Sequence, residues 1–353
     1  MATKITKSAF GTLASGKEIF AFELENGNCK ATVLSLGGII QSLFVRDKNG
    51  EFRDVTLGYD TPQEYFTKGG TLGAVCGRFA NRIKEGKLTI DGKTYELYCN
   101  DRGNHLHGGK IGYHQRVFDG EIVEENGDQA LCLQLFSPNG EENYPGNLQL
   151  TVKYSLTGAA LKIEYFAKAD QKTAINLTNH AYFNLNGAGS GSAYDHTLTI
   201  AADYITPTDE NMIPDGTFLP VKGTPFDFTA GKTVREGDDY TETNEHLKKG
   251  AGFDHCFVLD KGRDQALPIA VLQGNESGIT MKCYTSLPAV QLYAGNFLQM
   301  DGKGGKRYDR GGGLCLETQD IPNNVNEPAY EAYGSSIYAA GEEYYSVTVY
   351  AFS

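Results

Sequence analysis

The chain is most constrained by a regular alternation of apolar and polar residues. Between 148 and 156 every second residue is apolar, and a similar run over 161–165 follows a Thr157-Gly158 turn. The apolar residues of the first run are Leu148, Leu150, Val152, Tyr154 and Leu156. A period of two indicates a strand with one buried face, and two such runs joined by a turn predict an antiparallel hairpin.

The same signal recurs along the chain. Residues 87–97 form a second predicted hairpin, because Asp91-Gly92 favours the type I′ turn that joins two strands. Helical periodicity is confined to short stretches at 61–66 and 234–247. Many short strands separated by turns predict an all-β sandwich or barrel with few short helices. Further strands are predicted at 29–36, 39–45, 130–136, 196–201, 255–259, 268–273, 279–284, 289–293 and 344–351.

The length of the chain bears on its domain organisation. A chain of 353 residues exceeds the usual domain size of about 100–150 residues. It contains no Pro/Ser-rich linker, low-complexity segment or clear repeat at which it would divide. We therefore expect residues 1–353 to form a single domain, one large antiparallel β-sandwich whose turns use the 43 glycines.

The net charge limits the kinds of binding partner that the protein can have, and its cysteines indicate the compartment in which it works. The net charge is −12 and no basic stripe occurs, which argues against nucleic acid or an anionic membrane and favours a neutral small molecule. The seven cysteines are scattered and form no CxxC pair, which is typical of free thiols in a reducing cytoplasm. The first seven residues lack an apolar signal core, and no long apolar run follows. We expect a cytoplasmic protein, either a monomer or a weak homodimer.

Two ionisable residues stand out in this strand-rich sequence. His180 is the centre of the amide-rich, strand-like segment 176–185, and Glu317 ends an apolar run. A carboxylate at the end of a buried strand is unfavourable unless it is paired or used. A histidine and a glutamate together can act as a general acid and a general base. Neither an activated nucleophile nor a metal-binding cluster accompanies them, so proton transfer without a cofactor or a metal is expected.

Further polar clusters flank predicted strands. They are Gly77-Arg78-Phe79-Ala80-Asn81-Arg82-Ile83, Asn104-His105-Leu106-His107-Gly108-Gly109, Gly252-Phe253-Asp254-His255-Cys256-Phe257 and Gln291-Leu292-Tyr293-Ala294-Gly295-Asn296-Phe297. A structural role would explain any one of them. Arginines commonly form surface ion pairs, and an aspartate such as Asp254 commonly ends a loop. His105-x-His107 has the spacing of metal ligands, but no carboxylate or cysteine lies nearby in the sequence. Together they supply the many hydrogen-bonding groups that a sugar requires.

In this order, the motifs NLTNHAYFNL, GRFANRI, LHGG, GFDHCF, QLYAGNF and LETQD resemble the aldose 1-epimerases, also called galactose mutarotases. The segments 36–40 and 144–148 are also similar to that family, so the resemblance covers nearly the whole chain. It implies a β-supersandwich fold and the interconversion of the α and β anomers of an aldohexose such as galactose or glucose.

The resemblance also implies roles for individual residues. Glu317 matches the family's catalytic base and His180 its catalytic acid. The implied sugar-binding residues are Asn81, Arg82, His107, Asp254, Gln291 and Phe297. Ordinary pKa values of about 4.3 for glutamate and about 6.5 for histidine are expected to leave Glu317 ionised as the base and His180 protonated as the acid.

Three alternatives remain open at this point. A sugar-phosphate epimerase, such as a glucose-6-phosphate 1-epimerase, would need a cationic pocket, for which Arg78, Arg82 and Lys84 are candidates. A carbohydrate-binding sandwich without activity would stack sugars on exposed aromatic residues, often tryptophan, which this chain lacks. A retaining glycosidase would need a second carboxylate about 5–5.5 Å from Glu317, and only Asp254 is a candidate.

Overall fold

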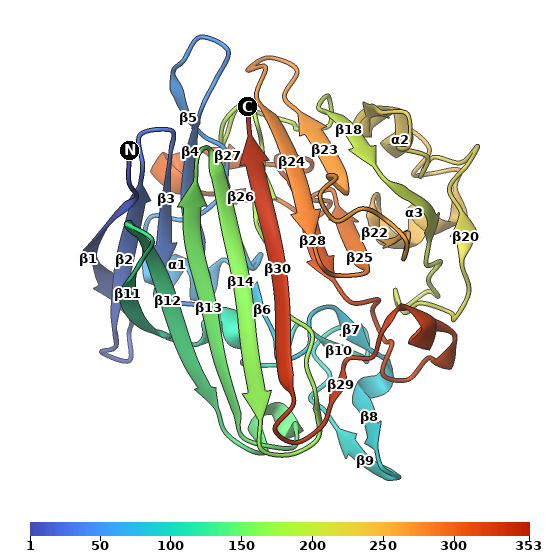
Figure 1. The fold of residues 1–353 in the computed structure, drawn as a ribbon. Coiled ribbons are helices and arrows are strands. Elements are labelled where there is room, and N and C mark those ends of the chain that lie inside the picture. The colour runs from blue at the N-terminus through green and yellow to red at the C-terminus, as the bar shows by residue number, and fades with distance from the viewer.

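The longest alternating runs form a nine-stranded antiparallel sheet, most of which faces the viewer in Figure 1. The computed structural model describes residues 1–353. The predicted hairpin at 148–165 is confirmed, with Thr157 opposite Ala160 at its turn. In sheet order the strands are β11 (Asp119–Glu125), β12 (Asp128–Ser137), β13 (Leu148–Thr157), β14 (Ala160–Ala169), β30 (Glu343–Phe352), β24 (Thr280–Thr285), β23 (Ala270–Gln273), β18 (Thr197–Ile200) and β21 (Lys232–Thr233).

A six-stranded antiparallel sheet lies behind β30 and β24 and carries Glu317, Gln291 and Asp254 of the candidate site. Phe183 packs on Tyr350 of β30 with ring centroids 4.8 Å apart, and the Tyr350 hydroxyl donates to the Leu316 carbonyl at 3.0 Å. Both sheets contribute to one core cluster of 59 buried residues. In sheet order the strands are β17 (Tyr182–Phe183), β28 (Leu314–Gln319), β25 (Ala289–Tyr293), β22 (Asp254–Leu259), β19 (Ala202–Ile205) and β20 (Leu219–Pro220).

The N-terminal part forms a third sheet of five strands in chain order. The amide of Ile5 donates to the Gln129 side chain at 2.7 Å, which joins this sheet to β12. The alternation predicted the third and fourth strands but not the first two. Only one of the nine residues of the first strand is buried. The second strand was missed although four of its eight residues are buried. The strands are β1 (Lys4–Thr12), β2 (Glu18–Glu25), β3 (Cys29–Leu34), β4 (Ile40–Arg46) and β5 (Phe52–Asp54).

Short two-stranded ladders complete the fold. The predicted hairpin at 87–97 is confirmed, and Asp91 and Gly92 both have the positive φ of a type I′ turn, 51° and 79°. The ladders pair β8 (Lys87–Ile90) with β9 (Lys93–Glu96), β7 (Arg82–Ile83) with β10 (His105–Leu106), β6 (Val75–Cys76) with β16 (Thr178–Asn179), β15 (Thr173–Ala174) with β29 (Ile337–Tyr338), and β26 (Met300–Asp301) with β27 (Arg307–Tyr308).

The helices are short. The prediction at 61–66 is confirmed as α1 (Pro62–Thr67), which begins at a Thr61–Glu64 capping box. The single stretch predicted at 234–247 is wrong, because it divides into α2 (Val234–Asp238) and α3 (Glu245–Gly250). The side chain of Asn244 accepts from the amides of His246 and Leu247, so a new helix starts there. The 3₁₀ turns are η1 (Lys84–Gly86), η2 (Tyr113–Gln115), η3 (Glu141–Asn143), η4 (Lys303–Gly305) and η5 (Pro328–Tyr333).

The three sheets confirm the expected all-β supersandwich. All their strand pairs are antiparallel, and the helices are few and short. None of the helices has the length and apolar character needed to cross a membrane. All seven cysteines are free.

Candidate active site

One face of the six-stranded sheet carries two adjacent rows of site residues. The first row runs across four strands, with Tyr182 opposite Cys315, Cys315 opposite Tyr293 and Tyr293 opposite Asp254. In the next row Glu317 of β28 lies opposite Gln291 of β25. Directly opposed residues of antiparallel strands project to the same face, so the pairing register alone gathers these side chains.

His180 reaches this face because its strand changes partners. The strand-like segment 176–185 divides into β16, which pairs with β6, and β17, which pairs with β28. At the change, the His180 amide donates to the Ala74 carbonyl at 2.8 Å, and the His180 carbonyl accepts from the Gly73 amide at 3.0 Å. The backbone at His180 is thus fixed on both sides while its ring points toward β28.

A pair of loops supplies the opposite wall. Asn81 and His107 both have positive φ, 63° and 50°, next to the β7–β10 ladder. The two loops touch at Gly108, where a Cβ would collide with the Gly77 carbonyl oxygen. The glycine of the LHGG motif therefore allows the loop that carries His107 to pack against the loop that carries Asn81 and Arg82.

Arg78 does not form the surface ion pair that was one reading of its motif, because the structure buries it. It is 2% exposed, and its guanidinium donates to the carbonyls of Pro145 and Gly146 at 2.9 and 3.0 Å. It also donates to the Ser137 hydroxyl at 2.6 Å. Arg78 therefore holds the 144–148 turn in place and is not available to a ligand.

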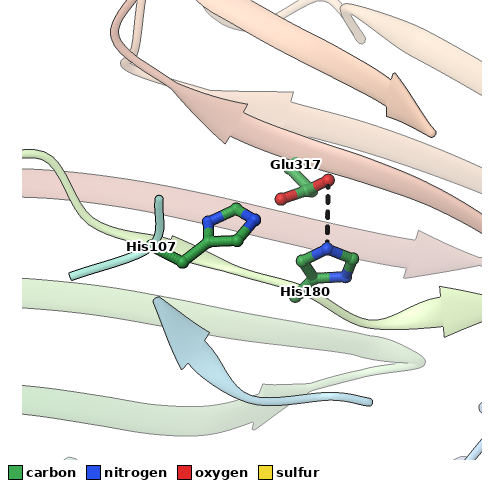
Figure 2. A group of neighbouring side chains, drawn as sticks. All are labelled: His107, His180 and Glu317. Atoms are coloured by element: carbon green, nitrogen blue, oxygen red, sulfur yellow. Dashed lines mark ion pairs between the residues drawn. The ribbon is translucent and has the colours of Figure 1, made fainter. Parts of the chain in front are cut away.

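The three side chains at the centre of the site converge from three segments, as Figure 2 shows. The Nε2 atom of His180 lies 3.6 Å from Oε1 of Glu317, while the rings of His107 and His180 meet edge to face at 5.4 Å. Glu317 is 2% exposed, and its Oε2 atom has no hydrogen-bond partner. A buried carboxylate oxygen left without a donor is a position where a ligand hydroxyl would be held strongly.

Burial reverses the order of pKa values that was expected for this pair. Burial raises the pKa of Glu317 well above its usual value, the nearby Asp254 raises it further, and Arg82 opposes the shift. Burial also lowers the pKa of His180 to about 4. The expectation of an ionised Glu317 and a protonated His180 is therefore wrong for the ligand-free pocket, where a single proton resides on Glu317 in preference to His180.

His107 is fixed as a hydrogen-bond donor toward the pocket. Its Nδ1 atom accepts from the Asn81 amide at 3.1 Å, so a neutral His107 carries its proton on Nε2. Burial lowers the pKa of His107 well below its usual value, and the neighbouring His180 and Arg82 lower it further.

The same hydrogen bond bears on metal binding. His107, His180 and Glu317 each present a ligating atom within 4.8 Å of the others. A metal needs the Nε2 lone pair of His107, which is taken by the proton that the Asn81 contact keeps there. The His105-x-His107 pair is no alternative, because His105 accepts from the Tyr144 hydroxyl at 2.6 Å and contacts the Tyr98 carbonyl at 2.8 Å. The residues present do not fit a metal.

The binding residues form a charged network beside the pair. Gln291 donates to Oδ1 of Asp254 at 2.6 Å, and the guanidinium of Arg82 lies 3.8 Å from Oδ2 of Asp254. On its other side Arg82 donates to Asp101 at 2.8 Å. Asp101 was not expected, and nothing in its sequence context marks it as the partner of Arg82.

These residues enclose one polar pocket of about 240 Å³. Seven of the eight predicted site residues line it, and the eighth, Gln291, lies against Asp254. Phe297 stands at the rim and is 62% exposed. Tyr182 and Tyr293 were not predicted, although the alternation in 289–293 places Tyr293 on the same face as Gln291. The full lining is Gly70, Thr71, Asn81, Arg82, Asp101, Arg102, Leu106, His107, His180, Tyr182, Asp254, Tyr293, Phe297 and Glu317.

Comparisons with known proteins place the chain in a family. Residues 21–351 match the family model described as aldose 1-epimerase. The galactose mutarotase of Mus musculus is 41% identical over 352 residues, which cover 99% of this chain and 98% of that protein. The aldose 1-epimerase of Escherichia coli K12 is 35% identical over 93% of each chain.

Solved structures give the same result. The crystal structure of galactose 1-epimerase from Lactobacillus acidophilus NCFM superimposes with a TM-score of 0.86 at 28% identity, over 100% of this chain and 99% of that one. An aldose epimerase homologue from C. elegans has a TM-score of 0.84 at 30% identity, over 94% of this chain and 98% of that one. By sequence along its whole length and by fold, the chain belongs to the aldose 1-epimerase family, a family of isomerases.

Proposed function

We propose that this protein interconverts the α and β anomers of free aldohexoses, with galactose and glucose as substrates. One observation carries the proposal: a buried glutamate and histidine lie 3.6 Å apart in a pocket whose other polar groups are arranged to hold hydroxyls. Two proton positions on opposite sides of a sugar's C1–O5 bond are what ring opening requires. The family of the chain supports the same reaction.

The reaction then follows from where the protons go. Glu317 takes the proton of the C1 hydroxyl while His180 gives a proton to the ring oxygen, and the C1–O5 bond breaks. The open aldehyde rotates about C1–C2, and the ring closes on its other face with the two roles reversed. The reactive state carries one proton on the pair. A C1 hydroxyl that donates to Oε2 of Glu317 favours the ionised carboxylate and moves that proton toward His180.

The other pocket residues assist in distinct ways. The Nε2–H group of His107 and the guanidinium of Arg82 can donate to oxygens on which negative charge develops during opening. Asn81, Gln291 and Phe297 are proposed to contact the sugar. No step requires redox chemistry, a phosphate or a covalent enzyme intermediate.

The alternatives are less well supported by the same residues. Of the cations considered for a phosphate, Arg78 is buried against the 144–148 turn and Arg82 is flanked by Asp101 and Asp254. The exposed Arg102 also lines the pocket and is the remaining cation there without an ion pair. Lys84 is exposed and does not line the pocket. Asp254 is already compensated by Gln291 and Arg82, which suits a binding role better than that of a glycosidase carboxylate.

The broader assignments remain proposals. We propose that residues 1–353 act as one domain, because the pocket draws on residues from Gly70 to Glu317 and the core cluster extends from Ile5 to Phe352. A cytoplasmic location is supported by seven unpaired thiols. The monomer or weak homodimer and the lack of nucleic-acid and membrane partners stay predictions from the sequence.

Activity should show a bell-shaped dependence on pH. The active pair holds one proton, so activity is lost below about pH 4, where His180 is protonated as well as Glu317 and no base remains. On the basic side, activity is lost as pH rises through the raised pKa of Glu317, where the pair has no proton to give. Both limbs of the pH profile report apparent pKa values of the coupled Glu317–His180 pair and not of either residue alone. A kcat/KM profile checks this, and a flat profile contradicts it.

Asp254→Ala is expected to weaken binding more than catalysis. A carboxylate that accepts from sugar hydroxyls contributes equally to ground and transition states, so KM should rise about 10- to 100-fold with kcat little changed. Because Asp254 raises the pKa of Glu317, its removal should also move the basic limb to lower pH. Asp119→Ala, at an exposed position on β11, is the matched control. An unchanged KM with a collapsed kcat would reopen the glycosidase alternative.

The proposed function is tested by polarimetry. Freshly dissolved α-D-galactose and α-D-glucose should approach their equilibrium rotation faster with protein than without, in the presence of EDTA and without nucleotide. The same assay with galactose 6-phosphate should show much weaker acceleration. Rates equal to the buffer control for both free sugars would reject the proposal.

A further inference from the structure

Backbone conformations that only glycine adopts freely gather around the pocket. Twelve residues other than glycine have a φ in the left-handed region, and four of them line the pocket: Thr71 at 53°, Asn81 at 63°, Arg102 at 46° and His107 at 50°. Such conformations are unfavourable, and they collect where function requires them. Thr71 is the only β-branched residue among the twelve, so its conformation is the most strained of these.

The loop between α1 and β6 holds Thr71 in this conformation. Before Thr71, the Gly70 carbonyl accepts from the Tyr182 hydroxyl at 3.0 Å. After it, the Gly73 amide donates to the His180 carbonyl at 3.0 Å. The loop is therefore tied to the segment that carries the catalytic histidine on both sides of Thr71, and the backbone of Thr71 is not free to relax.

No hydrogen bond within the protein uses the Thr71 hydroxyl. The side chain is half-buried and lines the pocket. A glycine would adopt the same backbone conformation at lower cost, as the neighbouring Gly70 does with a φ of 85°. The strained backbone thus places in the pocket a hydroxyl group that makes no hydrogen bond to the rest of the chain.

We propose that Thr71 is a further sugar-binding residue, whose hydroxyl group holds one of the sugar's hydroxyls other than that at C1. The C1 hydroxyl is assigned to Glu317, which leaves the remaining hydroxyls of the sugar to the other groups of the pocket. A threonine hydroxyl can both donate and accept a hydrogen bond, as a sugar hydroxyl can. This inference rests on the proposed function, because that function identifies the ligand as a free aldohexose.

A fixed loop suits this role. A side chain that is already in place before the ligand arrives loses less conformational entropy on binding than a mobile one. Arg82 and Asp254 hold the sugar with charged groups that also face each other, 3.8 Å apart. Thr71 adds a neutral contact from a loop outside the six-stranded sheet, so its contribution can be separated from that of the charged network.

Three substitutions distinguish the hydroxyl from the shape and the strain of Thr71. Thr71→Val keeps the branched shape and removes the hydroxyl, and Thr71→Ser keeps the hydroxyl. Thr71→Gly removes the hydroxyl and relieves the strain. The matched control is Asn126→Gly, because Asn126 also has a positive φ, 52°, but lies exposed in the turn between β11 and β12 and does not line the pocket.

A thermal melt of Thr71→Gly tests whether the side chain serves the fold. Glycine takes the left-handed conformation without a clash of its own Cβ, so the variant should melt at or above the temperature of the wild type. A clearly lower melting temperature would show that the threonine side chain supports the fold, and would overturn the proposal.

Kinetics test whether the side chain serves the ligand. KM for galactose should rise about 3- to 10-fold in Thr71→Val and Thr71→Gly, the scale of one lost hydrogen bond, with kcat within about twofold. Thr71→Ser and Asn126→Gly should keep the wild-type KM. An unchanged KM in Thr71→Val, or a serine variant as impaired as the valine variant, contradicts a contact through the hydroxyl.

Deoxygalactoses identify the contact without depending on turnover. In the wild type, loss of the contacted hydroxyl should weaken binding about 3- to 10-fold, whereas in Thr71→Val the same deoxy sugar should bind as well as galactose, because the partner is already gone. Dissociation constants from NMR titrations with the sugars deoxygenated at C2, C3, C4 or C6 measure this. Losses that are equal in both proteins for all four sugars overturn the proposal.

The two proposals fail in different ways. If the wild type binds galactose but does not accelerate mutarotation, the proposed function fails, while the dissociation constants still decide what Thr71 does. If the wild type accelerates mutarotation and the Thr71 variants bind every sugar as the wild type does, only the role of Thr71 fails.

Discussion

Replacing Glu317 with glutamine is expected to lower kcat by about 10²–10⁴-fold while galactose still binds, because the amide keeps the size of the carboxyl group but cannot accept the C1 proton. The folded protein should not lose stability. Burial favours the neutral form of Glu317, and glutamine is a neutral side chain of nearly the same size. Mutarotation kinetics, sugar binding by calorimetry and a thermal melt measure the three effects.

The matched control for this substitution is Glu164→Gln. Glu164 is also a largely buried carboxylate in a strand, but it lies on β14 next to Lys162 and Tyr345, outside the pocket. It should keep full activity. Near-full turnover in Glu317→Gln would remove Glu317 from the role of base and leave the pocket without an evident proton acceptor.

His180→Asn is expected to cause a loss of similar size, about 10²–10⁴-fold in kcat, because asparagine cannot deliver a proton to the ring oxygen. Binding should change less, since His107, Arg82 and Asp254 still line the pocket. The variant should also lose the acid limb near pH 4, because that limb reports the second protonation of the coupled pair, which requires the His180 ring. Rate measurements at several pH values check both effects.

His246→Asn serves as the comparison, because His246 lies on α3 and does not line the pocket. If His180→Asn retained most of its activity, the acid would have to be another residue, with His107 first in line. That outcome would conflict with the hydrogen bond from the Asn81 amide, which leaves His107 no room for a second proton.

The sequence predicted the fold best where one strand face is buried and the other is not. The hairpin of β13 and β14 shows this pattern over its full length, and its register follows the alternation. β1 was not predicted because it buries almost nothing, and β2 was missed although four of its eight residues are buried. The division of 234–247 into two helices was not predicted, because it depends on the Asn244 cap and helical periodicity does not detect a cap.

The candidate site could be predicted only in part. The motifs identified eight candidate site residues, and seven of them line the pocket. Asp101 gave no signal, because its importance comes from its contact with Arg82, which lies 19 residues away in sequence. The pKa order of Glu317 and His180 was wrong because ordinary values describe exposed groups, and both residues are buried.

The central claim is that only oxygen-bound protons move, between Glu317, the sugar and His180. It is tested most directly by proton exchange spectroscopy on galactose at anomeric equilibrium in D₂O. The wild type should give exchange cross-peaks between the H1 signals of the α and β anomers, at full H1 and H2 intensity, and Glu317→Gln should give almost none. Loss of the H1 or H2 signal to deuterium would show that a carbon–hydrogen bond breaks, and would contradict ring opening by this pair.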